Sequence, residues 1–596
     1  MDLQKFYAGN EFEAFDYLGC HKTDDGFVFR TWAPAAEKVS LIGSFSDWNE
    51  MEMTRCANGN FFEVTVSHAA QGDMYKYRIY HGGDFIDHAD PFAFYAEKRP
   101  GNASRVWDLS ADEPFTDDDY RAERKDTHNQ PLNIYEMHFG SWVKKGEAAD
   151  DWYTYRELAP ILSEYLLDHH YNFVEIMPLT EYPADESWGY QGTGYFAPTA
   201  RYGTPADLKA FVDHMHECGI GVLMDYVPVH FAVDGYGLRN YDGTPLFEYP
   251  NGDIGASEWG SCNFMHSRGD IRSFLNSSAW FWLKEYHFDG LRYDAVGNLI
   301  FWQGNEGRGE NKMAQDFLRN LNHGLKKRDP MCVLCAEDST SWHGCTAPCA
   351  EGGLGFDYKW DLGWMNDTLW FFSQPASARR EHYHKLTFSM MYYYNDRYLL
   401  PLSHDEVVHG KKTIVDKMYG SYDDKFTQAR AFYVYMYTHP GKKLNFMGNE
   451  IGQMREWDEK REQDWDLLDY PVHAGFQIFM TELSELYETH PALFEKDFDR
   501  EGFEWVDCHQ EDKVVYLFER RSEDERLLCV FNFSEWDQRV AYTPSERLRL
   551  DLLIDSCDAT YGGSVCRKEG VINVDGSKDL YLPAYCARVY KVQKIF

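Results

Sequence analysis

Residues 1 to about 115 alternate between short runs of apolar or aromatic residues and turn signals. The runs are GFVFRTWAP, KVSLIGSF, FFEVTVS and YKYRIYH, and the turn signals between them include DDG, NGN and QGD. Apolar positions at period two, bounded by Gly, Asp and Asn, are typical of short antiparallel strands. The pattern predicts a β-sandwich module at the N-terminus.

From Asn133 the pattern changes to an apolar strand, a loop and then a longer helical stretch. The segment 205–219, PADLKAFVDHMHECG, is typical of these helices, because it opens on Pro205 and stops at Gly219. Eight strand candidates alternate with helices over about 330 residues, which predicts a parallel (β/α)8 barrel. The candidates are NIYEMH, NFVEIMP, GVLMDYVPVH, FDGLRYDAV, CVLCAEDS, FDYKWDL, YLLPLSH and KLNFMGNE.

After about residue 495 strand-like runs return, as in KVVYLFERR, RLLCVFNFS and ARVYKV. They predict a second β domain. The predicted fold class is therefore multidomain α/β. An N-terminal β-sandwich (1–115) and a C-terminal β-sandwich domain (496–596) flank a central TIM barrel (116–495).

The charge and hydropathy of the chain limit the kinds of molecule that it is expected to bind. The chain has 59 Lys and Arg against 97 Asp and Glu, a net charge of −38, which repels nucleic acid and anionic membrane surfaces. The N-terminus lacks a basic, apolar leader, and no window approaches 18 consecutive apolar residues. We expect a cytoplasmic monomer that binds neither nucleic acid nor membrane.

The cysteines offer one candidate metal site. Cys332, Cys335, Cys345 and Cys349 have spacings similar to those of zinc ligands. However, MCVLC reads as a strand, in which residues three apart point to opposite faces, so buried free thiols are the preferred interpretation. The chain also has no Asp-x-Asp-x-Asp-Gly calcium loop. We predict no required metal and no organic cofactor.

Polar residues directly follow four of the predicted strands. In a (β/α)8 barrel the loops after the strands form the active face, so such residues indicate function. Three separate carboxylates with Arg and His, and no phosphate-binding loop, suit glycoside chemistry. The residues, in strand order, are Asp225 and His230; Arg292 and Asp294; Glu337 and Asp338; and His404, Asp405 and Glu406.

Each of these residues also has a structural interpretation. Asp225 could cap the end of a strand, and Arg292 and Asp294 could form an ordinary ion pair, although the guanidinium would also keep the carboxylate ionised. Glu337 and Asp338 are adjacent and point apart, so only one of them faces a cavity easily. Their joint order along the barrel favours function.

Several motifs resemble known families. DYVPVH, GLRYDAV, AEDST and LSHDE resemble, in the right order, the four signature regions of the α-amylase superfamily. LSHDEVVHGKKTI, EMHFGSW, GGLGFDYKWDLGWMNDTL and FMGNEIGQ resemble the 1,4-α-glucan (glycogen) branching enzymes specifically. FRTWAPAAEKVSLIGSFSDWN resembles the glucan-binding β-sandwich that precedes their barrel. The likeness spans nearly the whole chain, although Tyr293 fills a slot usually taken by a smaller aliphatic residue.

The resemblance implies a role for each candidate residue. Asp294 would be the nucleophile, Glu337 the general acid/base and Asp405 the stabiliser of the transition state. The residues implied for substrate binding and support are Tyr190, Asp225, His230, Arg292 and His404. Among these, Tyr190 would stack under the reacting sugar and Arg292 would orient Asp294.

The implied activity is a transglycosylation on glycogen or amylose-like chains. An α-1,4 linkage would be cleaved and the segment transferred to a 6-hydroxyl, with retention of anomeric configuration. Two alternatives stay open. One is a hydrolase that removes α-1,6 branches or releases trehalose, and the other is a glucan-binding scaffold with an inactive barrel.

Overall fold

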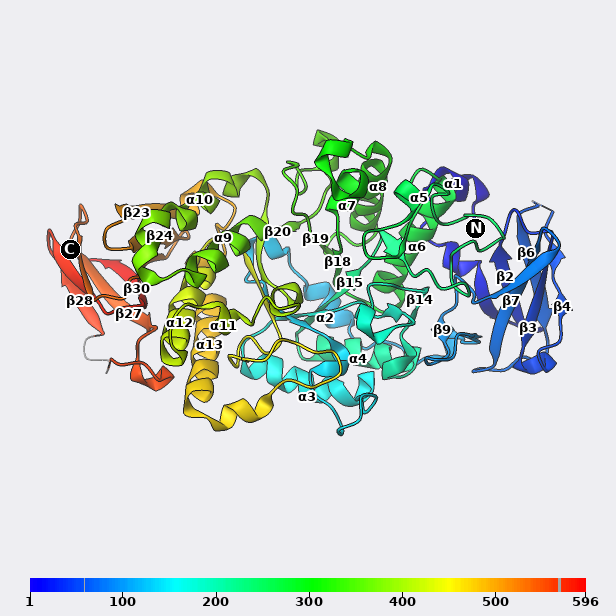
Figure 1. The fold of residues 1–596 in the computed structure, drawn as a ribbon, viewed down its shortest axis with the longest axis horizontal. Coiled ribbons are helices and arrows are strands. Elements are labelled where there is room, and N and C mark those ends of the chain that lie inside the picture. Colours follow the sequence, from blue (N-terminus) through cyan, green and yellow to red (C-terminus); the bar gives the residue numbers. More distant parts are fainter. Residues whose placement is uncertain (58, 566–569, 596) are drawn as a thin grey trace. The chain divides into compact units, whose positions relative to one another are not determined.

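The computed structural model describes residues 1–57, 59–565 and 570–595. The chain forms two compact units, and Figure 1 labels their elements. The first unit comprises Met1–Arg124, His138–Ser163 and Glu175–Phe356. The second comprises Lys125–Met137, Glu164–Val174 and Asp357–Phe596. The predicted domain limits, 115/116 and 495/496, remain predictions.

Two antiparallel sheets form the predicted N-terminal sandwich. The first has the order β1 (Gly19–Thr23), β2 (Gly26–Trp32), β6 (Phe61–Val66), β5 (Thr54–Arg55). The second has the order β4 (Met51–Glu52), β3 (Lys38–Gly43), β7 (Met74–His81), β10 (Ser104–Arg105), β9 (Tyr95–Ala96), with β8 (Asp84–His88) paired to β7. Buried aromatic residues hold the layers together, as where the rings of Phe29 and Tyr75 lie 4.9 Å apart edge to face.

Eight strands close into a parallel barrel; seven lie within the predicted runs, and the eighth, at Lys442, begins one residue before its run. Nearly every residue in them is buried, which explains why these strands read as continuous apolar runs rather than alternating ones. In barrel order they are β11 (Asn133–Met137), β12 (Phe173–Ile176), β15 (Gly221–Tyr226), β18 (Gly290–Tyr293), β19 (Val333–Ala336), β20 (Tyr358–Trp360), β21 (Tyr398–Leu402) and β22 (Lys442–Phe446).

α-Helices separate the barrel strands, except β19 and β20, between which lies only the short 3-10 turn Cys349–Glu351. Helix α4 (Pro205–Glu217) begins where the sequence predicts, because Thr204 and Asp207 form a capping box and Pro205 occupies the first turn. It is followed by Gly219, whose φ of 77° favours glycine. The other main helices are α3 (Tyr155–Asp168), α6 (Gly269–Glu285), α8 (Lys312–Arg328), α9 (Leu362–Ser373), α10 (His384–Tyr392), α12 (Tyr422–Thr438) and α13 (Pro471–Thr489).

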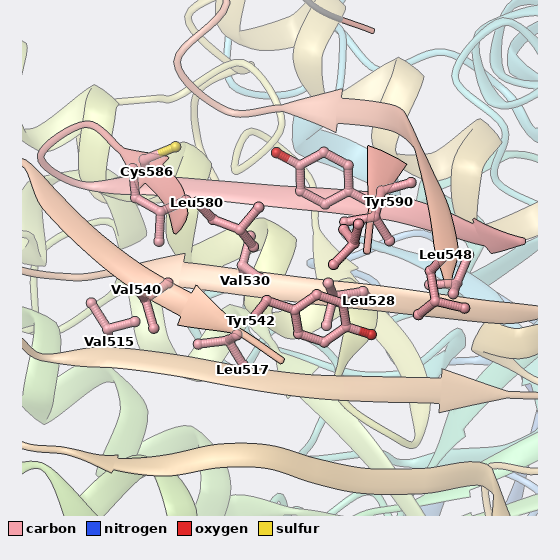
Figure 2. Close-up of a cluster of buried hydrophobic side chains, with 14 of the residues drawn as sticks. Val515, Leu517, Leu528, Val530, Val540, Tyr542, Leu548, Leu580, Cys586 and Tyr590 are labelled. Carbon is pink, nitrogen blue, oxygen red and sulfur yellow. The ribbon is translucent and has the colours of Figure 1, made fainter. Parts of the chain in front are cut away.

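The predicted C-terminal β domain is confirmed. One sheet has the order β23 (Phe503–Gln510), β24 (Val515–Arg521), β25 (Arg526–Asn532), β30 (Cys586–Lys594), β27 (Leu548–Asp555), β28 (Val571–Val574). β26 (Gln538–Tyr542) pairs with β29 (Lys578–Leu582). Alternate side chains of these strands fill a buried core that includes Leu517, Leu528 and Val530 (Figure 2). Within the described ranges, no helix combines the length and the apolar character that crossing a bilayer requires.

A buried charge network joins three elements of the first unit. Both ring nitrogens of His216 on α4 face carboxylates: Nδ1 lies 2.7 Å from Asp117 Oδ2 and Nε2 lies 2.9 Å from Asp289 Oδ2. Asp289 also accepts a hydrogen bond from the Val222 backbone. Burial opposes a charge on the imidazole, but the attraction of Asp289 and the bond to Asp117 outweigh it and raise the pKa of His216 to about 9.

This network predicts a pH-dependent stability. Because the His216 pKa is raised from 6.5 to about 9, its contribution is fully present below pH 6.5 and is lost as the pH rises through about 9. The difference corresponds to about 3 kcal/mol. We expect His216→Gln to lower the unfolding temperature at pH 7 and to flatten its fall between pH 7 and 10, measured by differential scanning fluorimetry.

His214→Gln is the matched control, since His214 lies on the same helix with a side chain that is one-third exposed. It should leave the pH profile unchanged. Parallel profiles for wild type and His216→Gln would contradict the assignment.

Candidate active site

Strand register brings the first group of candidate residues together in the first unit. Asp225, near the end of β15, is the register partner of Arg292 on β18, and Arg292 is in turn the partner of Cys335 on β19. The ladder continues beyond the strands, since the Asp294 backbone N–H donates to the Tyr226 carbonyl. Neighbouring parallel strands therefore deliver these side chains to one edge.

Arg292 binds three carboxylates with one guanidinium group. Its Nη1 lies 2.5 and 2.6 Å from the two oxygens of Asp225 and 3.2 Å from Asp294 Oδ1. Its Nη2 lies 2.7 Å from Glu337 Oε2. Asp225 and Arg292 are fully buried, whereas the side chains of Asp294 and Glu337 are 14% and 20% exposed. The latter two can therefore be reached by a bound molecule.

The electrostatics of this cluster follow from its charges. Burial disfavours the Arg292 cation, but attraction to Asp225 and Glu337 outweighs burial and raises the pKa of Arg292 well above its usual range. Glu337 also accepts a hydrogen bond from the Ala295 backbone N–H, at 2.9 Å. Ala295 has a φ of 47°, an unusual conformation for a non-glycine residue and one that often marks functional sites.

Tyr190 joins the same cluster from a tight turn. Its hydroxyl donates to Asp225 Oδ2 at 2.5 Å and lies 3.3 Å from Arg292 Nη1. The preceding residue, Gly189, has a φ of 95°, and a Cβ there would lie 2.4 Å from the Pro178 carbonyl oxygen. The turn that presents Tyr190 therefore requires glycine at position 189.

His230 lies beside Asp294. Its Nε2 is 3.9 Å from Asp294 Oδ2, and burial lowers the pKa of His230 to about 4, so the ring is neutral at pH 7. The ring of Trp259 lies 5.0 Å from the imidazole and is 44% exposed. Gln191 anchors this loop by donating to the Trp259 carbonyl oxygen. Sequence reasoning did not single out Trp259, because loop tryptophans are common in this chain.

In the second unit, His404 and Asp405 follow β21. Glu136, buried on β11, holds His404 twice: Oε1 lies 2.6 Å from Nδ1, and Oε2 accepts from the His404 backbone N–H at 3.0 Å. A proton on Nδ1 leaves Nε2 facing Asp405 Oδ1, 3.6 Å away. Sequence reasoning assigned no role to Glu136, although a carboxylate inside a buried strand is itself a signal.

Other candidate residues have structural roles. Asp338 is buried and accepts hydrogen bonds from the Thr340 backbone and hydroxyl, so Glu337 and Asp338 do point apart, as predicted. The unusual Tyr293 packs in the core, with its ring 5.0 Å from that of Phe356. Glu406 Oε1 lies 3.3 Å from Lys411 Nζ and so braces its loop.

Comparison with known proteins identifies the flanking domains. Residues 17–93 match the model for carbohydrate-binding module 48 (isoamylase N-terminal domain), and residues 505–593 match the alpha amylase, C-terminal all-beta domain. Two solved pullulanases share the fold. That from Bacillus acidopullulyticus has a TM-score of 0.72 at 17% identity and covers 96% of this chain and 74% of its own. That from Anoxybacillus sp. LM18-11, complexed with maltotetraose, has a TM-score of 0.72 at 18% identity, with 97% and 89% covered.

The domain order and the barrel define an amylase-class protein. Curated relatives are more specific. The 1,4-alpha-glucan branching enzyme of Geobacillus stearothermophilus is 42% identical over 90% of this chain and 85% of its own length. That of Fusobacterium nucleatum is 42% identical over 95% and 93%. The chain belongs to the 1,4-alpha-glucan branching enzyme family.

The Arg292 cluster predicts that lysine cannot replace this arginine. A lysine keeps the charge but cannot present two nitrogens to separate carboxylates, so Asp294 and Glu337 would lose their common anchor. We expect Arg292→Lys to lower turnover on amylose by about 100-fold or more. Arg268→Lys, at a partly exposed pair with Asp270, should keep wild-type turnover. Near-normal activity of Arg292→Lys would contradict this role.

Proposed function

We propose that this chain is a retaining 1,4-α-glucan branching enzyme. It cleaves an α-1,4 linkage of a glucan and transfers the released segment to a 6-hydroxyl of a glucan chain. The observation that carries the proposal is the single guanidinium of Arg292 bound to both Asp294 and Glu337 in a chain 42% identical to branching enzymes. One anchor for two carboxyl groups supports the short separation that retaining enzymes use.

In the first step, Asp294 attacks the anomeric carbon while Glu337 gives its proton to the glycosidic oxygen. The Arg292 cation keeps Asp294 ionised, which the nucleophile requires. Glu337 is the more exposed of the two carboxylates, which suits a group that exchanges a proton with substrate. The bond to the leaving oxygen breaks and a covalent glucosyl–Asp294 intermediate forms.

In the second step, Glu337 acts as a base. It removes the proton from a 6-hydroxyl of the acceptor chain, and that oxygen attacks the anomeric carbon and displaces Asp294. Two inversions give net retention. Water competes for the same step, so branching depends on an acceptor that is held in position, an orientation advantage worth roughly several kcal/mol.

We assign the role of transition-state stabiliser to Asp405. It follows β21, and Asp294 and Glu337 follow β18 and β19 of the same closed barrel. In such barrels the loops at the carboxyl ends of the strands build the active face. The Asp405 side chain is 47% exposed, and its charge would favour the cationic transition state.

Two histidines complete the proposed sugar site. His230, with its pKa lowered to about 4, donates or accepts a hydrogen bond to a sugar hydroxyl without adding a charge near Asp294. Glu136 directs the Nε2 of His404 toward the Asp405 side, where it would bind a second hydroxyl. Tyr190 would stack under the reacting sugar, and Asp225 would hold Arg292.

The activity itself is tested on amylose. Branching lowers iodine colour without a matching rise in reducing ends, whereas hydrolysis raises reducing ends in proportion to colour loss. We expect the first result, with new α-1,6 linkages in the product by proton NMR. A proportional rise would favour a hydrolase instead.

The role of Asp294 is tested by Asp294→Ala. We expect turnover to fall by about 10⁴-fold or more, because no nucleophile remains. Asp316→Asn is the control, since Asp316 is an exposed acid on α8 that pairs with Arg319. Turnover of Asp294→Ala within tenfold of wild type would overturn the mechanism. Equal unfolding temperatures of the variant and the wild type would show that a loss of turnover does not come from misfolding.

Trp259 predicts a separate contribution to binding. An exposed indole 5.0 Å from the His230 ring offers a flat face to a sugar. We expect Trp259→Ala to raise KM for amylose about fivefold to tenfold with little change in kcat. Trp536→Ala, at an exposed tryptophan of the C-terminal domain, is the control and should leave KM for amylose unchanged. An unchanged KM for Trp259→Ala would contradict this contact.

A further inference from the structure

Two cysteines of the C-terminal domain lie beside each other, Cys557 in the turn after β27 and Cys586 at the start of β30. Asp555 at the end of β27 is the register partner of Arg588 on β30. The chain then turns at Ser556 and Cys557, where the Asp558 backbone N–H donates to the Asp555 carbonyl. The Ser556 backbone N–H donates to the Ala587 carbonyl. The turn that follows β27 therefore leaves Cys557 next to Cys586, the first residue of β30.

The two sulfurs are close and buried. The Sγ atoms of Cys557 and Cys586 and a carboxylate oxygen of Asp555 all lie within 4.8 Å of one another, and the three residues are buried. Cys586 belongs to the apolar cluster shown in Figure 2, and Cys557 is part of the same cluster. Two sulfurs this close, which also share a hydrogen bond, are placed to form a disulfide.

The surroundings favour a disulfide over a metal ion. Among the three candidate ligands, Asp555 alone offers oxygen atoms. One of these is already paired, because Arg588 Nε lies 2.8 Å from Asp555 Oδ2. Asp555 Oδ1 accepts from the Cys557 backbone N–H at 3.0 Å. A second guanidinium is close, because Arg430 on α12 donates to the Ser556 carbonyl. Two arginines beside the cluster oppose an added cation but stabilise a thiolate.

The two thiols are not equivalent. A hydrogen bond from Cys586 lowers the pKa of Cys557, against the effect of burial, and Arg430 adds to the lowering. Burial raises the pKa of Cys586 well above its usual range. Cys557 is therefore the thiol that ionises first and acts as the nucleophile, and Cys586 is the thiol that resolves the intermediate.

We propose that Cys557 and Cys586 form a reversible oxidation site that closes to an intramolecular disulfide between β30 and the turn after β27. With hydrogen peroxide, the Cys557 thiolate attacks one oxygen, the O–O bond breaks, and the departing hydroxide takes up a proton to become water. The Cys586 sulfur then attacks the resulting sulfenic sulfur. Its proton and the released hydroxide form a second water. In total, two thiols lose two electrons and two protons to one peroxide.

The crosslink has a stabilising consequence. It joins two segments that are already paired, so it restricts the unfolded chain while requiring little change in the folded one. It also locks the turn that Arg430 of α12 contacts. Because both sulfurs are buried, peroxide reaches them through local opening, and the reaction is expected to be slower than that of an exposed thiol.

The test uses the full-length protein, reduced, desalted and treated with hydrogen peroxide before its remaining thiols are alkylated. Peptide mapping by mass spectrometry should find the crosslink between Cys557 and Cys586, reversed by dithiothreitol. The apparent unfolding temperature should rise by about 3 °C or more on oxidation. Cys557→Ser and Cys586→Ser should each abolish that rise, whereas Cys508→Ser and Cys566→Ser should keep it.

Three results would overturn the proposal. One is a crosslink between other cysteines, including Cys566. A second is overoxidation of Cys557 to the sulfinic acid without any crosslink. A third is stoichiometric binding of Zn²⁺ alone to the reduced protein, with protection of both thiols, which would identify a metal site instead. The wild-type mapping decides between these outcomes even where a serine variant folds poorly.

Discussion

The contact between one buried guanidinium and three carboxylates governs the site in the first unit. Arg292 and Asp225 are both fully buried, and removing two such charges from water costs free energy. The short hydrogen bonds from Arg292 to both oxygens of Asp225 offset that cost. Asp294 and Glu337 then use the remaining hydrogen-bonding capacity of the same cation. The partly exposed acids Asp294 and Glu337 are thus held in place by the fully buried pair of Arg292 and Asp225.

That contact depends in turn on strand register. Arg292 meets Asp225 because β15 and β18 pair with these two residues as neighbours. A slip of one residue would turn Arg292 toward the opposite face of the sheet and leave Asp225 buried without a counter-charge. The register of the barrel and the ionisation of the site are therefore one constraint. The buried His216 network likewise pairs buried charges at the N-terminal end of β18, where His216 of α4 meets Asp289.

The order of elements could be predicted because burial leaves a direct record in the sequence. All eight barrel strands are apolar runs bounded by loops, and the polar residues at their ends stand out against them. The role of Glu136 was harder to predict, since its partner His404 lies 268 residues away and no local pattern links the two residues. Trp259 is one loop tryptophan among several. The closeness of Cys557 and Cys586 depends on the pairing of β27 with β30 and on the turn after β27, which only the folded domain defines. Tyr293, which departs from the pattern of the family, packs in the core.

The barrel is closed by its first and last strands, with β11 paired to β22. This pairing has a consequence for synthesis of the chain on the ribosome. Asn133 on β11 can pair with Lys443 on β22 only after Lys443 has left the exit tunnel. More than half of the polypeptide is therefore synthesised while this edge of β11 stays unpaired. The N-terminal sandwich, whose strands pair among themselves, has no such delay. The need for chaperones should therefore be greatest between the synthesis of β11 and the synthesis of β22.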